Sequence, residues 1–390
     1  MTNFVRPLSS FCLAFLGASL LIAQSAVRAR DLGVPFDGQP GPANAITDVQ
    51  GVEVGSTTII SGDGPLKVGA GPIRTGVTVV LPRGKQSSDP VYAGWFSQNG
   101  NGEMTGTTWI EESGFLEGPV AITNTHSVGL VRDAVIAWRL KHGKLQQPWS
   151  LPVVAETWDG WLNDINGFHV KQDIVFDALD NAHSGAIAEG NVGGGTGMVC
   201  YGFKGGTGTA SRVLSKADGG YTVGVLVQCN CGRRPQLTVA GVPVGKEIQQ
   251  DIPYAMFHDN AGGEHEGDLG SIIIVVATDA PLLPHQLKRL ARRATMGLAR
   301  TGSTSGNGSG DIFVAFSTAN PEADKEPGPN QVLAVSNERI NPLFAATVEA
   351  TEEAIVNAMI GARTMTGIDG HRVIELPHDQ LQQALKKYNR

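Results

Sequence analysis

The order of apolar and polar positions predicts a chain in which strands and helices mix without regular alternation. Unbroken or alternating apolar runs indicate strands, and apolar residues at helical spacing indicate helices. The clearest elements are strands at 75–81, 221–227, 271–277 and 312–316, and helices at 127–140, 285–299 and 342–360. Long apolar strands among such helices favour packed sheets covered by helices over a doubly wound parallel sheet.

Two strands stand out in this pattern. The run 271–277 is the most apolar after the N-terminal region and predicts a buried strand. The strand at 221–227 is followed by a second apolar segment, 237–244, which we expect to be its hairpin partner.

A segment without apolar residues, 301–308, leads directly into the strand at 312–316. A flexible segment that enters a buried strand through Ser309 suits an N-terminal-nucleophile hydrolase. In such an enzyme the serine hydroxyl attacks the peptide bond before it, and the freed amine then acts as general base. The same pattern also suits a glycine-rich loop before a core strand.

The N-terminal residues 1–29 have the pattern of a removable signal peptide. The apolar run 11–23 is too short for a confident membrane span, and Val27-Arg28-Ala29 fits a small-residue cleavage site. The mature chain would then begin at Arg30 and be periplasmic or secreted. A buried N-terminal helix is the alternative. No later stretch is long and apolar enough to span a bilayer.

Composition excludes several classes of function. The net charge is −7 without a strong basic cluster, which argues against a nucleic-acid partner. The glycine run 193–197 lacks the Gly-Lys-Ser/Thr ending of a phosphate loop. His265, in the polar segment 251–267, lacks a spaced second histidine, so we expect a loop rather than a metal site.

The mature chain keeps an odd number of cysteines, Cys200, Cys229 and Cys231, which rules out a complete disulfide framework. Cys229 and Cys231 lie two residues apart in a strand-like stretch, so their side chains should share a face. We expect this pair to serve packing, because a second pair of metal ligands is lacking.

Two motifs carry a resemblance to a known family. Asn307-Gly308-Ser309-Gly310-Asp311 is followed by Ala315-Phe316-Ser317-Thr318, and Ala350-Thr351-Glu352-Glu353-Ala354-Ile355 comes later in the expected order. The chain resembles the self-processing aminopeptidases of peptidase family S58, which include the L-aminopeptidase/D-amidase-esterases and the β-peptidyl aminopeptidases. This resemblance implies an α+β fold, an αββα sandwich of the N-terminal-nucleophile type. It also implies a homo-oligomer that needs no metal or organic cofactor.

The resemblance further implies one catalytic domain that cuts itself between Gly308 and Ser309. The α-chain would span 30–308 and the β-chain 309–390, with Ser309 as the N-terminal nucleophile. Substrates would be short peptides, amides or esters that lose their N-terminal residue. Ser305 is the next candidate if cleavage occurs elsewhere.

The family's other site residues can be assigned by resemblance. Its paired hydroxyl and carboxylate fall on Thr351 and Glu353, although Thr347 and Glu349 have the same spacing. Its oxyanion donors match Asn230 and Tyr201 best. Its carboxylate for the free amine of the substrate matches Glu189.

Two other functions stay open at this level. One is a self-processing acyltransferase of the same fold, such as the ornithine acetyltransferases. Those usually have a threonine nucleophile and work in the cytoplasm, so Ser309 and the expected export signal argue against it. The other is a periplasmic binding protein on the same scaffold that does not cut itself.

Overall fold

The structure is a computed structural model that describes Met1 and residues 27–390, except 146, 254–269 and 326–328. Most of the expected signal peptide, residues 2–26, lies outside the described residues, as does His265. In the described part of the chain, no helix has the length and apolar character needed to cross a membrane.

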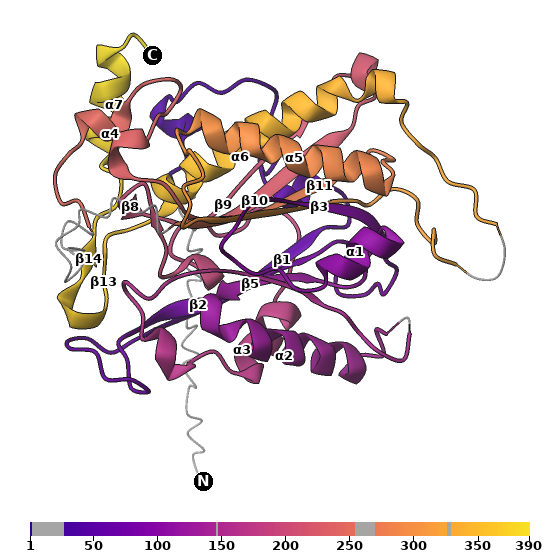
Figure 1. Cartoon of the computed structure of the whole chain (residues 1–390), viewed down its shortest axis with the longest axis horizontal. Helices are drawn as coiled ribbons and strands as arrows, with labels where there is room; N and C mark the ends of the chain where they lie inside the picture. The colour runs from indigo at the N-terminus through magenta and orange to yellow at the C-terminus, as the bar shows by residue number, and fades with distance from the viewer. Residues whose placement is uncertain (2–26, 146, 254–269, 326–328) are drawn as a thin grey trace.

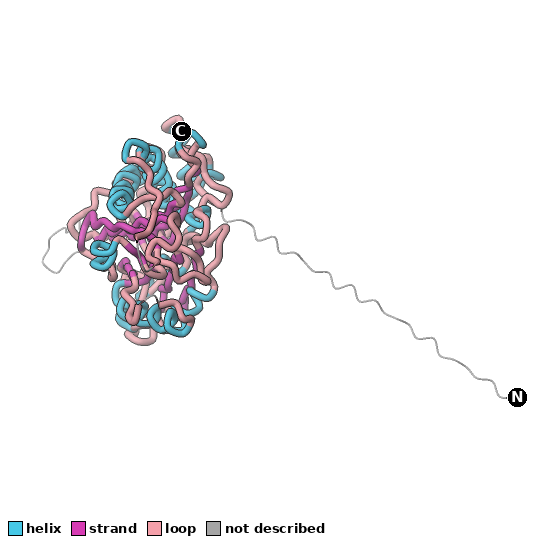
Figure 2. The backbone as a smooth tube through the Cα atoms, turned by 90° about the vertical axis from the view of Figure 1, so that its right-hand side faces the viewer, coloured by secondary structure: helices cyan, strands magenta, loops and turns pink. Residues whose placement is uncertain are grey.

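Two sheets pack face to face between layers of helices, which confirms the predicted αββα sandwich (Figures 1 and 2). The larger sheet has the strand order β4-β3-β12-β11-β10-β9 and the smaller one β1-β2-β5-β6. In the larger sheet the strands are β4 Phe115–Leu116, β3 Val91–Gly100, β12 Gly310–Ser317, β11 Ser271–Thr278, β10 Thr222–Asn230 and β9 Gly206–Val213. In the smaller sheet they are β1 Glu53–Ser61, β2 Ile73–Leu81, β5 Val120–Asn124 and β6 Val153–Thr157.

The three helices predicted from apolar spacing are present and cover the sheets. Helices α5 (Pro284–Arg300) and α6 (Asn341–Gly361) lie on the larger sheet, and α2 (Val128–Lys141) and α3 (Gln172–Asp180) lie on the smaller one (Figure 1). The predicted apolar stripe of α5, including Leu287, Leu290 and Leu298, is buried. Burying such a stripe is the main source of helix stability in a globular protein.

Smaller elements complete the chain. These are helices α1 Thr107–Ser113, α4 Val244–Glu247 and α7 His378–Lys387, and the two-stranded pairs β7 Val199–Cys200 with β8 Phe203–Lys204, and β13 Met365–Thr366 with β14 Arg372–Val373.

The central strand β11 is buried on both faces. The alternation of its side chains shows which way the side chain of its first residue points. Ile272 and Ile274 belong to the core under α5 and α6, whereas Ile273 and Val275 belong to the core between the sheets. Successive side chains of a strand alternate between faces. Ser271, at the start of β11, therefore points toward the space between the sheets.

The expected hairpin between 221–227 and 237–244 is wrong. Strand β10 pairs with β9 and β11, both antiparallel, and in the second segment the structure has only an isolated bridge between Val239 and Val242. Both edges of β10 are occupied, one by β9 and the other by β11, so the nearby segment has no edge to join.

The N-terminal residues Arg28 and Ala29 are part of the fold. Ala29 is fully buried, and its N–H donates to Asn357 Oδ1 over 3.0 Å. The Arg28 guanidinium forms an ion pair with Glu189 at 2.8 Å and donates to the Thr209 carbonyl. These contacts disfavour the expected mature chain that begins at Arg30.

Candidate active site

Three neighbouring strands of the larger sheet bring polar side chains together at one end. Strands β11 and β12 run parallel with Ser271 beside Gly310, and β10 runs antiparallel with Asn230 opposite Ser271. Directly opposed residues of an antiparallel pair have their side chains on the same face, about 4.5–5.5 Å apart at Cβ. Ser271 and Asn230 are thus neighbours, and Ser309 immediately precedes the residue beside Ser271.

A cleft of about 550 Å³ opens at this end of the sandwich. Its lining combines a serine, carboxylates, an aromatic ring and the backbone around Gly308. The lining residues are Asn101, Gly102, Glu103, Thr125, Glu156, Trp158, Ser271 and Gly308. Glu156 comes from β6 of the smaller sheet and Ser271 from β11 of the larger one, so the cleft lies between the two sheets.

The Ser309 side chain does not line this cleft. Ser309 is fully buried, and its hydroxyl donates to Asp311 Oδ1 over 2.6 Å. By contrast, Ser271 lines the cleft, and its hydroxyl accepts a hydrogen bond from the Gly310 N–H over 3.3 Å. Of the two serines, the geometry therefore favours Ser271 as the one that meets a substrate.

Backbone contacts hold the Gly308–Ser309 segment in place. Asn101 Nδ2 donates to the Gly308 carbonyl over 2.8 Å, and the Asn101 N–H donates to the Ser309 carbonyl over 3.2 Å. A Cβ atom on Gly310 would clash with the Asn101 carbonyl oxygen, so this close approach requires glycine. The glycines and asparagines of the motif thus pack β12 closely against the end of β3.

The predicted oxyanion donor Asn230 lies opposite Ser271, which lines the cleft. Its carboxamide oxygen accepts from the Val199 N–H at 2.7 Å, and its amide nitrogen donates to the Trp158 carbonyl at 3.1 Å. These two bonds fix the orientation of the amide group beside Ser271. A fixed side-chain amide is the kind of donor that stabilises a developing oxyanion.

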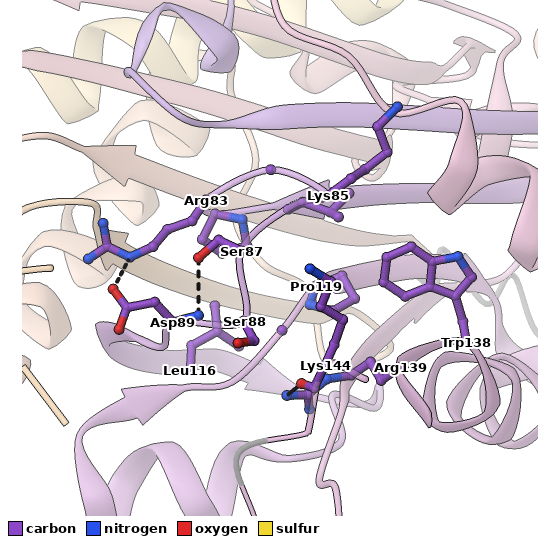
Figure 3. Close-up of a pocket in the computed structure, with 14 residues that line it drawn as sticks. Arg83, Lys85, Ser87, Ser88, Asp89, Leu116, Pro119, Trp138, Arg139 and Lys144 are labelled. Atoms are coloured by element: carbon purple, nitrogen blue, oxygen red, sulfur yellow. Dashed lines mark hydrogen bonds and ion pairs between the residues drawn. The ribbon is translucent and has the colours of Figure 1, made fainter. Parts of the chain in front are cut away.

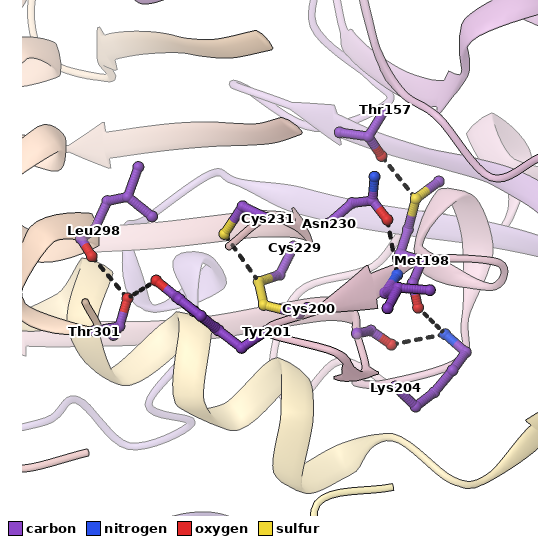
Figure 4. The surroundings of a disulfide bond; sticks show 12 residues. Thr157, Met198, Cys200, Tyr201, Lys204, Cys229, Asn230, Cys231, Leu298 and Thr301 are labelled. Atoms are coloured by element: carbon purple, nitrogen blue, oxygen red, sulfur yellow. Dashed lines mark hydrogen bonds between the residues drawn. A yellow bond between two sulfur atoms is a disulfide. The ribbon is translucent and has the colours of Figure 1, made fainter. Parts of the chain in front are cut away.

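The predicted second donor, Tyr201, lies elsewhere. The Tyr201 phenol is fully buried, and its oxygen is 2.8 Å from Thr301 Oγ1, just after α5 (Figure 4). The Thr301 hydroxyl in turn donates to the Leu298 carbonyl. Tyr201 therefore packs into the core under the helices, and its assignment as an oxyanion donor is not supported.

The Thr351 hydroxyl is not directed at either serine. It donates to the Thr347 carbonyl over 2.7 Å, and the Thr347 hydroxyl donates to the Leu343 carbonyl over 2.8 Å. The partners of these buried hydroxyls are thus carbonyls of their own helix. The side chain of Thr351 packs against Gly297 of α5.

The Glu353 carboxylate is bound by cations on the β9 side of α6. It pairs with Arg212 and Arg30, each at 2.8 Å. Glu349, its alternative, lies 3.6 Å from Arg212. Because β9 is separated from β12 by β11 and β10, neither carboxylate reaches Ser309, and the assignment of a Thr/Glu pair beside the nucleophile is wrong.

The Glu189 carboxylate, predicted to bind the amine of the substrate, is occupied by the chain itself. Besides its ion pair with Arg28, it accepts the Thr209 N–H at 2.9 Å. Burial raises its pKa, and the charge of Arg28 works against that rise. Glu189 does not line the cleft, and the structure does not place it where the sequence interpretation needs it.

Glu156 is a carboxylate that does line the cleft. Its Oε1 accepts the Glu103 N–H at 2.9 Å and its Oε2 accepts the Thr125 hydroxyl. Burial raises the pKa of Glu156, with the hydrogen bond from Thr125 opposing the rise. A positively charged ligand stabilises the charged form of a buried carboxylate at a cleft.

The sequence interpretation missed Ser271 and Glu156. The signal for Ser271 was present, because it follows Gly270 and a polar segment and opens the most apolar strand of the chain. Ser309 has the same pattern, because it follows Gly308 and a polar segment and precedes an apolar strand. The signal for Glu156 was weaker: a carboxylate near the end of an otherwise apolar five-residue strand.

A second, smaller cavity of about 30 Å³ is lined by several cationic side chains (Figure 3). Arg83 pairs with Asp89 at 3.1 Å, Lys144 donates to the Gln86 carbonyl, and Arg139 donates to Ser150 Oγ. These cationic side chains already form ion pairs or hydrogen bonds with other protein groups. The cavity has room for little more than water. We assign it a structural role.

A serine at the tip of a central strand, inside a sandwich of two sheets covered by helices, defines a hydrolase of the N-terminal-nucleophile class. The chain belongs to peptidase family S58, whose model matches residues 44–373. It is therefore an aminopeptidase.

Similar proteins cover nearly the whole chain. The β-peptidyl aminopeptidase BapA of Sphingosinicella microcystinivorans is 56% identical over 384 residues, which is 96% of each chain. The solved L-aminopeptidase D-Ala-esterase/amidase of Ochrobactrum anthropi is 50% identical, with a TM-score of 0.85 over 93% of this chain and 99% of its own. A Burkholderia sp. β-aminopeptidase is 47% identical, with a TM-score of 0.83 over the same shares.

Proposed function

We propose that this aminopeptidase cuts itself between Gly270 and Ser271 and uses Ser271 as its N-terminal nucleophile. The observation that carries the proposal is the contrast between the two serines. Ser271 lines the cleft beside Asn230, whereas Ser309 is buried with its hydroxyl donated to Asp311. The chains formed would be residues up to 270 and residues 271–390, in place of the expected division at Gly308–Ser309.

The chemistry follows from the groups around the cleft. Cleavage frees the Ser271 α-amine, which takes the hydroxyl proton directly or through water as the oxygen attacks the substrate carbonyl. The Asn230 amide donates to the developing oxyanion. The Glu156 carboxylate receives the substrate ammonium, and this explains a preference for free N-termini.

Ser309 and Asp311 act as positioning residues in this proposal. The Ser309 hydroxyl is fixed by Asp311, and its chain neighbour Gly310 donates its N–H to the Ser271 hydroxyl. Removing the Ser309 hydroxyl should slow both self-cleavage and turnover, and it should leave the cleavage position unchanged.

N-terminal sequencing of the smaller chain tests the proposal. A start of Ser-Ile-Ile-Ile identifies Ser271, and a start of Ser-Gly-Asp-Ile identifies Ser309. Ser271→Ala should stay at full length and lose hydrolysis by at least about 1000-fold. Cleavage in Ser271→Ala, or a small chain that begins at Ser309, overturns the assignment; a small chain that begins at Ser305 also overturns it.

We further propose that the substrates are short peptides, amides or esters with a free N-terminal amine. The similar proteins support this range, because two carry the name β-peptidyl aminopeptidase or β-aminopeptidase and one the name L-aminopeptidase D-Ala-esterase/amidase. A panel of α- and β-aminoacyl anilides, D-alanyl amides and esters would rank them. N-acetylated versions should not be hydrolysed, because they lack the charge that Glu156 binds.

We also propose that residues before Arg28 form a leader and that the mature protein is periplasmic or secreted. Removal before Arg28 is supported by the Arg28–Glu189 ion pair and by the complete burial of Ala29. Sequencing of the larger chain from exported protein should find Arg28 and Ala29 retained. A start at Arg30 would return the boundary to the position expected from the sequence.

Association of the cleaved units into a homo-oligomer is a further proposal. Large apolar side chains are exposed on the described surface, including Leu140 at 59% and Trp149 at 58%. Light scattering of the purified protein gives its mass directly, and a mass equal to one chain pair contradicts this proposal.

A further inference from the structure

The cysteines of the described chain lie together in the core (Figure 4). A disulfide joins Cys200 of β7 to Cys229 of β10, and the Cys231 sulfur lies 3.9 Å from that of Cys229. All three sulfurs lie within 4.8 Å of one another, and all three residues are buried. Cys229 and Cys231 share the core under the helices, as expected, and the fold adds Cys200 from a distant part of the chain.

This sulfur cluster lies directly behind Asn230. Asn230 stands between Cys229 and Cys231 in sequence, and it accepts the N–H of Val199, the residue before Cys200. Strand β7 is thus joined to the end of β10 by the Cys200–Cys229 disulfide and by the hydrogen bond from Val199 to Asn230. The same junction holds the amide beside Ser271.

We propose that the reduced form of this cluster is a site for one thiophilic cation, such as Cd²⁺, Zn²⁺ or Cu⁺. A metal–sulfur bond of about 2.3 Å places three thiolate ligands about 3.8–4.0 Å apart. The spacing of 3.9 Å between Cys229 and Cys231 already meets this requirement. Soft thiolate ligands favour these cations over Mg²⁺ or Ca²⁺.

The disulfide and the cation exclude each other. A dithiol reductant supplies two electrons and two protons: its own thiols become a disulfide, and Cys200 and Cys229 become thiols. Binding of the cation then replaces the thiol protons of all three cysteines, which pass to solvent. Cation affinity should therefore rise with pH.

The surroundings supply a compensating positive charge. The buried Arg234 guanidinium donates to the carbonyls of Tyr201 and Gly202, the two residues after Cys200. A nearby guanidinium favours thiolate over thiol, whereas apolar surroundings alone favour the thiol. Three thiolates around a divalent cation carry a net charge of −1, which Arg234 offsets.

A cadmium titration of the reduced, full-length protein tests the site. The ultraviolet absorption band of a sulfur–cadmium bond should saturate at one Cd²⁺ per chain. Protein that keeps its disulfide should show no such band. Cys231→Ser removes one ligand without touching the disulfide partners, and after reduction it should bind Cd²⁺ at least about tenfold more weakly.

Absence of the band in reduced wild-type protein, or equal affinity in Cys231→Ser, overturns the proposal. Should Cys231→Ser not fold, alkylation of wild-type protein decides, because Cd²⁺ must protect all three cysteines and incomplete protection contradicts the site. Ser271→Ala should bind Cd²⁺ like wild-type protein. The cation site can therefore fail or succeed independently of the proposed nucleophile.

Discussion

Glu156 and Ser271 reach the same cleft from different sheets, and this arrangement permits a test of substrate recognition. Glu156→Gln keeps the shape of the side chain and one acceptor oxygen, and it removes the charge. Loss of a charged hydrogen bond to the substrate ammonium should reduce kcat/KM by roughly tenfold to 100-fold. Steady-state hydrolysis of an aminoacyl anilide measures this change, which should appear mainly in KM.

The pH dependence adds a second measurement on Glu156. Burial raises its pKa, so the carboxylate becomes charged only above the usual range of a glutamate. In wild-type protein KM should fall as pH rises through that raised pKa, and in Glu156→Gln this change should disappear. Glu103→Gln is the matched control, because Glu103 lines the same cleft but is exposed. An equal loss in both variants contradicts a specific role for Glu156.

At the level of single residues, the sequence predicted the class of reaction better than it predicted which side chains line the cleft. Ser271 and Ser309 are both small nucleophiles at the entry to a buried strand, so this pattern alone does not distinguish them. Only the register of β11 against β12, and the direction of each hydroxyl, separate them. Asn230, which was assigned by resemblance, lies opposite Ser271 because it ends the strand that pairs with the one that Ser271 begins.

Helix α6 is attached to strand β9 by a buried cluster of charges, which gives a prediction about stability. Glu353 is fully buried and pairs with Arg212 and Arg30. Glu353→Gln removes the nearer partner charge of the buried Arg212 and leaves only Glu349 at 3.6 Å, so the free energy of unfolding should fall by about 3 kcal/mol. Denaturant unfolding at neutral pH measures this loss.

The control for this variant lies one residue away. Glu352 pairs with Arg300, whose side chain is 46% exposed, so Glu352→Gln should cost about 1 kcal/mol or less. Burial raises the pKa of Glu353, but hydrogen bonds from Arg30 and the charge of Arg212 outweigh it and hold the pKa below its usual value. The contribution of Glu353 is therefore present above the unfolded pKa and is lost as pH falls through the lowered, folded pKa. A Glu353→Gln effect that persists at more acidic pH contradicts this account.

Elements were predictable from the sequence where a single face or a continuous apolar run defines them. Helices α5 and α6 and strand β11 fall close to their expected bounds. Pairing was not predictable, because it depends on which edges remain free after the sheet forms. The same limit explains why the ion pairs of Glu353 and Glu189 were not predicted. Their partners, Arg212 and Arg28, come from distant parts of the chain.

The order of strands in the larger sheet interleaves the two parts of the chain. Strands β11 and β12 lie between β3 on one side and β10 on the other, so the residues after 270 form the middle of the sheet. Separation of the chains after cleavage would break two complete backbone ladders. Cleaved protein should therefore elute from a sizing column as one species that contains both chains.

The two chains should part only when denaturant unfolds the sheet. Analysis of the same fractions on native and denaturing gels checks this. Recovery of either chain alone under native conditions would contradict the strand order on which the prediction rests.

This interleaving also makes the proposed self-cleavage depend on folding. The bond before Ser271 acquires its catalytic surroundings only when β12 has joined β11 and β10 has joined its other side. A chain that stalls with its middle strands unpaired therefore stays intact and inert. In the proposed scheme only a chain that has completed the sheet is cleaved, so a partly folded chain has no hydrolase activity.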